Sequence, residues 1–435
     1  FTYPEAIKYL ANKYNIEVEE TEQTDEQKIE SDEKESLYLV SDYANKFFQK
    51  SLKESDEGKS VGLSYFKERG FAEETINKFQ LGYCKDEWTS FTDQAIKDSY
   101  KIEFLEKSGL TIVKEEKKFD RFKGRVIFPI LSMSGRVLGF GGRTLKTSKS
   151  TAKYLNSPES KIYYKSKVLY GLFHAKQEIA KQDNCFLVEG YTDVMRMHER
   201  GIRNVVSSSG TALSSDQIRL INRLTNNITV VFDGDSAGIN AAFRGIDIIL
   251  EQGMNVKICN LPEGEDPDSF AKDKNVDELA SYFLENSKDF ITYKASLLIE
   301  GAKNDPIKKA ETIRDMVASI SKISDQIKKE IYIKECSSIM DISEEVLYST
   351  LAQISKKQIS KLNKPTPSPE DSFKVVKNKN EEKSINVLYE LEKKIIEILI
   401  LYGDKTENFE DLLLKENDAG ELVLEPVVKL SLIHI

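Results

Sequence analysis

The sequence predicts an α/β protein: a mixed α/β N-terminal subdomain, then a subdomain built on a parallel sheet, then a helical subdomain. From about residue 184, short apolar runs alternate with helical patterns. This alternation is typical of parallel strands that are covered by helices on both faces. From about residue 277 the apolar residues recur at helical spacing, as at Ile313, Met316, Val317 and Ile320.

The length and composition allow two or three compact domains, because 40% of the 435 residues are hydrophobic. No apolar stretch approaches the roughly 18 residues that a membrane span needs. We therefore expect a soluble cytoplasmic protein with no membrane contact. A monomer is also expected. The four cysteines are scattered and form no C-x-x-C pair, so buried thiols are expected rather than a zinc site or disulfides. His198 lies in a charged helical stretch and is expected to face solvent.

The first part of the chain changes character twice. Residues 1–16 suggest a short helix, and the acidic, polar stretch 17–36 predicts a flexible linker. The first globular region, 37–180, opens with helical patterns and continues into short strands such as 125–131 and 137–141.

A strongly basic segment lies within this first region, although the whole chain has a net charge of −9. From Arg121 to Tyr170 there are 11 basic residues and one acidic residue, which gives 11 − 1 = +10. A phosphate backbone responds to such local charge, since screening limits its reach to about a Debye length. A solvated basic face is the alternative.

The predicted parallel-sheet region, 181–276, places acidic residues where strands end. Its expected strands are 185–190, 204–210, 227–235 and 255–262. In open parallel sheets, ligands bind beyond the carboxyl ends of the strands. The acidic residues near these ends are Glu189, Asp233, Asp235, Asp266 and Asp268.

Two of these acidic sets have the form D-x-D, which can present two carboxylates to one place. A single D-x-D is more often a turn or a helix cap. Three acidic sets in order at strand ends would repel one another without cations, and hard oxygen ligands suit Mg²⁺ or Mn²⁺. The pattern therefore predicts a metal site for phosphoryl or nucleotidyl transfer.

The last part of the chain contains a helical region, 277–355, and then a charged stretch, 356–383. Alternate prolines in that stretch predict a stiff linker. An amphipathic helix is expected to open a further domain at 384–429. The final residues, 430–435, are expected to be a non-native tail, with a genuine amphipathic strand or helix end as the alternative.

Several motifs resemble a known family. VEGYTD and VVFDGDSAG are similar to the TOPRIM domain of primases, topoisomerases and some nucleases, and PEGEDPDSF resembles the third acidic motif. GRVIFPI, GRVLGFGGR, KYLNSPES and YYKSKVLYGL resemble the motifs that distinguish DnaG-type primases. The resemblance runs from residue 1 to about residue 355. It implies a DNA-dependent RNA polymerase that makes short RNA primers on single-stranded DNA during replication.

The resemblance also implies roles for individual residues. The metal-site acids would be Glu189, Asp233, Asp235, Asp266 and Asp268, of which Glu189, Asp233 and Asp235 would be catalytic. Residues that hold ribonucleoside triphosphates would be Arg143, Lys153, Tyr154, Asn156 and Lys165. Residues near the DNA would be Arg121, Lys123 and Arg125. For Tyr154, packing as a core aromatic is the alternative.

Both ends of the chain resemble parts of larger domains in this family. Residues 1–16 are similar to the last helix of a zinc-binding domain, so Zn²⁺ is expected only in a part that would precede Phe1. Residues 384–429 resemble the start of the domain that contacts the replicative helicase. The protein would then work in the replisome, at the nucleoid.

Three other functions stay open. The acidic motifs alone also suit a topoisomerase-like or nuclease TOPRIM protein, although KYLNSPES is foreign to those. A primase-helicase would need a phosphate loop, and the nearest candidate, Gly58-Lys59-Ser60, lacks the first glycine and a preceding strand. A scaffold that only binds single strands would not need the complete acidic set.

Overall fold

The computed structural model divides the chain into two units, Phe1–Lys364 and Pro365–Ile435. The residues that it describes are 25–115, 117–146, 152–210, 212–232, 239–301, 305–362, 414–416 and 422–424. In the second unit the described part is an antiparallel pair, β12 (Leu414–Glu416) with β13 (Leu422–Leu424). The expected segments 1–16 and 430–435 lie outside the described residues.

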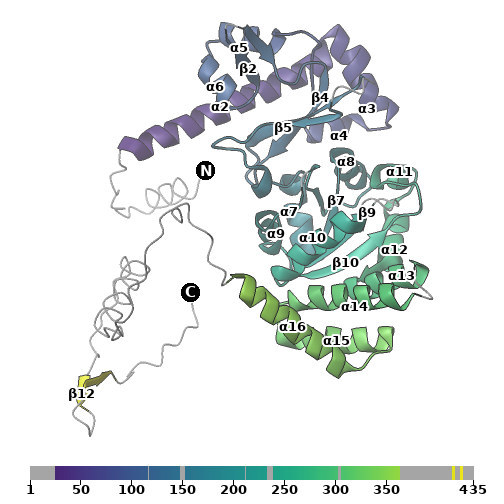
Figure 1. The fold of residues 1–435 in the computed structure, drawn as a ribbon. Coiled ribbons are helices and arrows are strands. Elements are labelled where there is room, and N and C mark those ends of the chain that lie inside the picture. Colours follow the sequence, from purple (N-terminus) through teal and green to yellow (C-terminus); the bar gives the residue numbers. More distant parts are fainter. Residues whose placement is uncertain are drawn as a thin grey trace, which may run out of the picture. The chain divides into compact units, whose positions relative to one another are not determined.

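The first unit begins with a long helix, α2 (Asp25–Glu54) (Figure 1). The prediction of a flexible linker over 17–36 is therefore wrong for residues 25–36. The acidic side chains that suggested disorder have basic partners on the folded body. Glu33 pairs with Lys107 at 2.9 Å and with Lys161 at 2.5 Å, and Glu35 pairs with Arg136 at 2.7 Å.

An antiparallel sheet in the order β1-β4-β5-β6 forms the centre of the N-terminal part. Every residue of β4 is buried, and Phe48 of α2 packs edge-on against Phe140 of β5. The sheet strands are β1 (Gly82–Cys84), β4 (Arg125–Leu131), β5 (Val137–Thr144) and β6 (Tyr154–Asn156). Beside them stand the hairpin β2 (Thr111–Lys114)–β3 (Lys117–Asp120) and the short helical elements η1 (Gly58–Leu63), α3 (Ser64–Glu68), α4 (Glu73–Lys78), α5 (Ser90–Lys97), α6 (Ile102–Lys107) and η2 (Lys165–Lys167).

The predicted parallel sheet is confirmed, and its strand order is β11-β10-β9-β7-β8. The four parallel strands are β7 (Cys185–Val188), β8 (Val205–Ser207), β9 (Asn227–Phe232) and β10 (Asn255–Asn260). The short strand β11 (Ser287–Asp289) joins antiparallel to β10.

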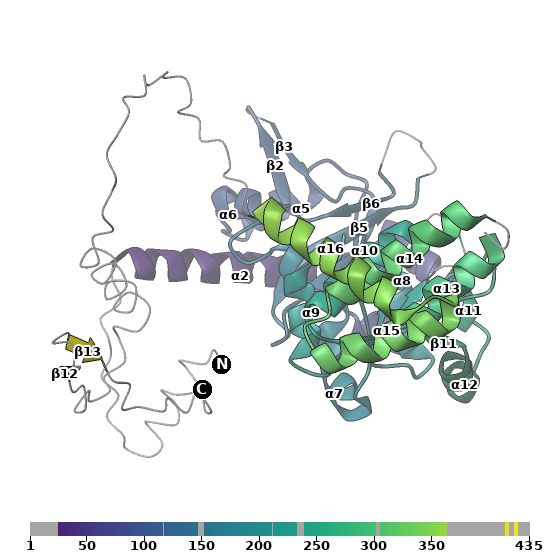
Figure 2. The ribbon, with the colours of Figure 1, turned by 60° about the horizontal axis from the view of Figure 1, so that its bottom comes forward.

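Helices cover both faces of this sheet (Figures 1 and 2). One core cluster joins it to α7 (Leu172–Gln182), α9 (Ser215–Asn222) and α10 (Ile239–Glu251). A second joins it to α8 (Tyr191–Glu199), α11 (Pro267–Ala271) and α12 (Val276–Asn286). The second cluster also contains Phe66 and Phe128 of the N-terminal part, so the two parts share one core.

Four helices follow, and the predicted apolar stripe of Ile313, Met316, Val317 and Ile320 is buried among them. They are α13 (Phe290–Gly301), α14 (Pro306–Ser321), α15 (Gln326–Met340) and α16 (Glu344–Leu362). Because α16 continues to Leu362, the linker predicted from residue 356 does not begin there. All four cysteines are buried free thiols, as expected. Among the described helices, none combines the length and apolar character that crossing a membrane requires.

Candidate functional site

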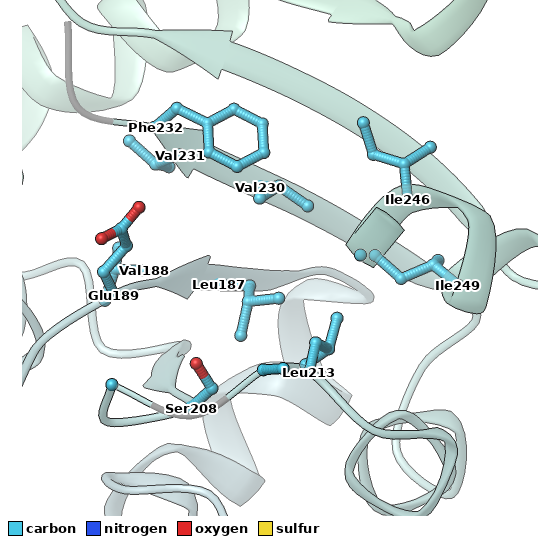
Figure 3. A pocket seen from close by; sticks show the side chains of 13 residues that line it. Leu187, Val188, Glu189, Ser208, Leu213, Val230, Val231, Phe232, Ile246 and Ile249 are labelled. Carbon is cyan, nitrogen blue, oxygen red and sulfur yellow. The ribbon is translucent and has the colours of Figure 1, made fainter. Parts of the chain in front are cut away.

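The carboxyl edge of the parallel sheet holds the first predicted acid. Glu189 directly follows β7, and β7 pairs with β9 so that Leu187 lies opposite Val230. Continuing this register puts Glu189 level with Phe232, the last residue of β9. Figure 3 shows the Glu189 carboxylate at the mouth of a cavity of about 390 Å³, near Phe232 and across from Ser208.

Asp233 follows Phe232 directly and Asp235 comes two residues later, and both lie outside the described residues. Among the residues that are described, no three His, Cys, Asp or Glu side chains gather into a group that could hold a metal ion. The cavity below Glu189 is otherwise mainly apolar, with side chains from β7, β9 and α10. Glu189 is thus the charged residue of this lining, and it lies at the mouth of the cavity. The residue that follows Phe232 in the sequence is Asp233.

The third acidic segment places its two carboxylates differently. Asp266 caps α11, where its Oδ1 accepts a hydrogen bond of 2.7 Å from the backbone N–H of Ser269. Asp268 is 5% exposed, and its carboxylate pairs with Arg196 at 2.9 Å and with Arg69. Both oxygens of Asp268 are thus occupied by guanidinium groups.

Arg196 is the centre of this buried cluster. Its guanidinium also pairs with Glu199 at 2.7 Å, donates to the backbone carbonyl of Gly70 at 3.1 Å, and lies 4.2 Å from the ring centre of Phe71. A buried charge is tolerated only when it is paired and hydrogen-bonded in this way. The cluster ties α8 and α11 to the turn that follows α3.

Arg143 and Lys153, two of the predicted nucleotide-binding residues, line one pocket of about 690 Å³. The opposite wall comes from η1 and α3 and includes Ser60, Ser64 and Tyr65. The Nε atom of Arg143 is buried and has no hydrogen-bond partner among the described residues. The pocket therefore offers the positive charge of Arg143 and Lys153 to an anion.

The other three predicted nucleotide residues lie apart from this pocket lining. The Asn156 side chain accepts a 2.7 Å hydrogen bond from Tyr191 and donates one of 3.2 Å to the Ser209 carbonyl. Tyr154 is 38% exposed, and its ring lies 5.7 Å from the Arg143 guanidinium. The Lys165 backbone carbonyl accepts a hydrogen bond from Gln217. The structure thus keeps Tyr154 beside Arg143 and uses the Asn156 amide to join β6 to the loop after β8.

The predicted DNA-binding residues also lie in different surroundings. Arg125 is buried, and its guanidinium donates to the carbonyls of Gly142, Ala152 and Lys153. Burial lowers the pKa of the Arg121 guanidinium, which makes one long hydrogen bond of 3.5 Å to the Asn156 carbonyl. Arg125 therefore holds together the backbone on both sides of residues 147–151.

Lys123 lies at the surface beside the protein's only tryptophan. Its ammonium group is 3.6 Å from the centre of the Trp88 ring and 3.7 Å from Asp86. Trp88 is 67% exposed, although a large aromatic side chain normally gains by burial. An exposed ring with a cation beside it is the arrangement on which nucleic-acid bases stack.

Sequence reasoning missed Trp88, Tyr65, Arg69 and Arg196. The occurrence of a single tryptophan in a loop before a basic segment is a weak signal that could have drawn attention to Trp88. No local pattern distinguishes Tyr65, Arg69 or Arg196, because their partners are far away in the chain. Arg69, for example, is 199 residues from Asp268.

The expectation that His198 faces solvent is wrong. Its side chain is buried against Phe79 and close to His174. Burial, with the nearby charge of Lys78, lowers the pKa of His198 to about 3 and that of His174 to about 4. The charged neighbours on α8 suggested a solvent face, but this turn of α8 packs on α4 and α7.

Three protein families match successive parts of the chain. The DNA primase catalytic core, N-terminal domain, matches residues 47–176, and a Toprim-like domain matches 186–271. The DnaB-helicase binding domain of primase matches 296–345. That segment lies within α13–α16, upstream of the stretch 384–429 in which the sequence placed the helicase contact.

Relatives and solved structures agree with these matches. The chain is 39% identical to the DNA primase of Clostridium acetobutylicum over 373 residues, and 30% identical to that of Halalkalibacterium halodurans over 399. These alignments cover 84% and 91% of this chain, but the chain spans only 60% and 66% of those proteins.

Among solved structures, a DNA primase domain from Pseudomonas aeruginosa superposes with a TM-score of 0.67 at 31% identity. That match covers 73% of this chain and 99% of the other chain. The DnaG primase catalytic domain bound to ssDNA gives a TM-score of 0.65 at 30% identity and covers 72% and 99%.

Proposed function

The chain belongs to the family of bacterial DnaG-type DNA primases, and we propose that it makes short RNA primers on single-stranded DNA by metal-dependent nucleotidyl transfer. The observation that carries this proposal is the arrangement around the parallel sheet. An acidic carboxyl edge at Glu189 and a cationic pocket at Arg143 occur in one folded unit. Nucleotidyl transfer needs both features: acids that hold divalent ions, and cations that hold a triphosphate.

We propose that Glu189, Asp233 and Asp235 hold Mg²⁺ or Mn²⁺. The register of β7 with β9 supports this, because it brings Glu189 level with the residue before Asp233. Carboxylate oxygens are the ligands that these ions prefer. When bound, the ions would stabilise the attacking and leaving oxygens of the transfer. Glu189, which is exposed at the edge, is also our candidate for moving the proton of the attacking hydroxyl.

Within the third acidic segment we assign different parts to the two aspartates. Asp266 remains a proposed member of the metal site, at the N-terminus of α11. Asp268 was expected to be a metal ligand as well, but its oxygens are occupied by Arg196 and Arg69. We propose that it fixes the position of this segment.

For the incoming ribonucleoside triphosphate, Arg143 and Lys153 would bind phosphate oxygens in the pocket that they line. The positive charge of both side chains in the pocket lining and the exposed position of Lys153 support this role. Tyr154 would contact the nucleotide beside Arg143. Asn156 would position the wall of the site through Tyr191, and Lys165 would approach from η2.

For the DNA strand we propose a surface formed by Lys123, Arg121 and Trp88. Lysine and arginine would contact phosphates irrespective of sequence, and Trp88 would stack on a base. Arg125 supports this surface from below through the carbonyls that it binds. The solved relative that is bound to ssDNA supports DNA as the template.

We further propose that the replicative helicase contacts the segment 296–345, in line with the family match there. The protein would act as a cytoplasmic monomer at the replisome. Zn²⁺ would be needed only by the domain that residues 1–16 resemble.

A primer-synthesis assay tests the function as a whole. The chain is incubated with a single-stranded template, labelled ribonucleotides and Mn²⁺, and the products are separated by length. Short labelled RNA that disappears in Asp233→Ala is the expected result. Relaxation or nicking of supercoiled DNA, in the absence of RNA synthesis, would instead point to a topoisomerase-like or nuclease activity.

A further inference from the structure

Tyr65 of α3 is bonded to two arginines that come from different parts of the fold. Its hydroxyl oxygen accepts hydrogen bonds from Arg143 of β5 and, at 3.2 Å, from Arg69. Both guanidinium groups also lie over its ring, at 4.9 Å and 5.7 Å from the ring centre. One phenol therefore holds two cations by hydrogen bonding and by cation–π attraction.

The geometry of the hydroxyl group leaves its proton for another partner. A phenol oxygen can accept through its lone pairs and donate through a single proton. Here the two arginines occupy the accepting positions, and the hydrogen bonds among the described residues give the proton no acceptor. Tyr65 lines the same pocket as Arg143 and Lys153. An unused hydroxyl donor beside these cations favours an anionic oxygen.

Tyr65 is also linked to Asp268 in the third acidic segment. Arg69 bonds to Tyr65 through Nη1 and to Asp268 through Nη2. Asp268 is fixed in turn by the buried Arg196. A continuous chain of contacts therefore runs from the pocket cation Arg143 through Tyr65 and Arg69 to the third acidic segment.

We propose that Tyr65 is a positioning residue for triphosphate binding. It holds the Arg143 guanidinium at one orientation in the pocket. Through Arg69, it also keeps that guanidinium at a fixed position relative to the third acidic segment. This inference rests on the proposed role of Arg143 in binding the triphosphate. Without the hydroxyl, Arg143 would still carry its charge but would sample several orientations, and so would bind phosphate oxygens more weakly.

The test compares Tyr65→Phe, Arg143→Lys and the double variant in the whole chain. Phenylalanine keeps the ring and its edge-on contact with Phe66, so the packing of α3 is retained. The matched control is Tyr43→Phe, which also removes a partly buried hydroxyl bonded to a charged partner, Asp98 at 2.6 Å, on α2. Equilibrium binding of ATP with Mn²⁺ is measured, together with kcat and KM for ATP during RNA synthesis.

Tyr65→Phe should raise the Kd and the KM for ATP by about tenfold, with a smaller change in kcat. In the Arg143→Lys background the same change should add no more than about twofold, because the two residues act as one unit. Tyr43→Phe should leave ATP binding unchanged.

Two results would overturn the inference while leaving the proposed function in place. One is an unchanged Kd in Tyr65→Phe when Arg143→Lys binds ATP weakly. The other is a double variant whose loss is the full product of the two single losses. If Arg143→Lys itself binds ATP normally, the proposed nucleotide site fails and this inference fails with it.

Discussion

The Nε–H of Arg196 donates a 2.9 Å hydrogen bond to Oδ1 of Asp268, 72 residues along the chain, and both side chains are buried. This pair separates Asp268 from the acids at the carboxyl edge of the sheet. In the sequence, Asp268 forms a D-x-D pair with Asp266, much as Asp233 does with Asp235. In the fold, Asp268 belongs to the Arg196 cluster, which joins α8 and α11. Because both side chains are buried, water screens their attraction only weakly.

The Arg196 cluster should matter for stability. Arg196→Met removes the cation between Asp268 and Glu199, and we expect a loss of about 3 kcal/mol in the free energy of unfolding, since a buried charge loses its partner. Urea unfolding measures this loss. The control is Arg219→Met, which removes an arginine from a solvent-exposed pair with Asp216 and should cost less than about 0.5 kcal/mol. Equal losses in the two variants would contradict a special role for the buried pair.

Substitutions of the acidic residues should cause two different defects, one in activity and one in stability. Asp233→Ala or Asp235→Ala should abolish ribonucleotide incorporation and leave the urea midpoint unchanged, because only ion binding is lost. Asp268→Asn should instead lower the midpoint, because it leaves the buried Arg196 without its full partner. Incorporation assays and urea titrations of the same preparations distinguish the groups. Normal synthesis by Asp233→Ala would rule out the proposed metal site.

Trp88 and Lys123 should affect DNA binding in different ways. Trp88→Ala should weaken binding of a single-stranded oligonucleotide by roughly 1–3 kcal/mol at every salt concentration, because a stacking contact is lost. Lys123→Ala should lower the slope of log K against log salt by about 0.7, the value for one phosphate contact with a single strand. Fluorescence titrations at several salt concentrations measure both effects. Lys181→Ala, which changes an exposed lysine on α7, serves as the control and should alter neither. An unchanged slope in Lys123→Ala would leave this lysine as a solvated surface charge.

Acid should destabilise the fold through the buried His198 and the half-buried His174. The pKa values of about 3 for His198 and about 4 for His174 lie below the ordinary value of 6.5, so the unfolded state takes up protons first as the pH falls. Their contribution to stability is therefore complete above about pH 6.5 and is lost as the pH falls toward the folded values.

His198→Phe keeps an aromatic ring against Phe79 and removes one titrating group. Between about pH 6 and pH 5, we expect the free energy of unfolding to fall less steeply in this variant, by up to roughly 1.4 kcal/mol per pH unit. Urea unfolding at a series of pH values tests this expectation. Identical slopes in the variant and the parent chain would mean that His198 is protonated in the folded state.

The elements that depend on local pattern could be predicted from the sequence. Alternating apolar runs and helical periods were enough to predict the parallel strands from Cys185 to Asn260 and the buried stripe at Ile313. Because strands in such a sheet run the same way, the position of Glu189 at a strand end also placed it at the carboxyl edge.

The contacts of each charged side chain, in contrast, depend on the folded arrangement of distant segments. Lys123 and Arg125 are two residues apart in one basic segment, but Lys123 lies on an exposed tryptophan and Arg125 is buried among carbonyls. Composition predicted a flexible linker over 17–36, whereas Glu33 and Glu35 pair with cations more than 70 residues away along the chain. Local sequence pattern fixes the course of the backbone through short-range geometry. The partner of a charge depends on which distant segments the folded core brings within a few ångströms, and no local pattern contains that information.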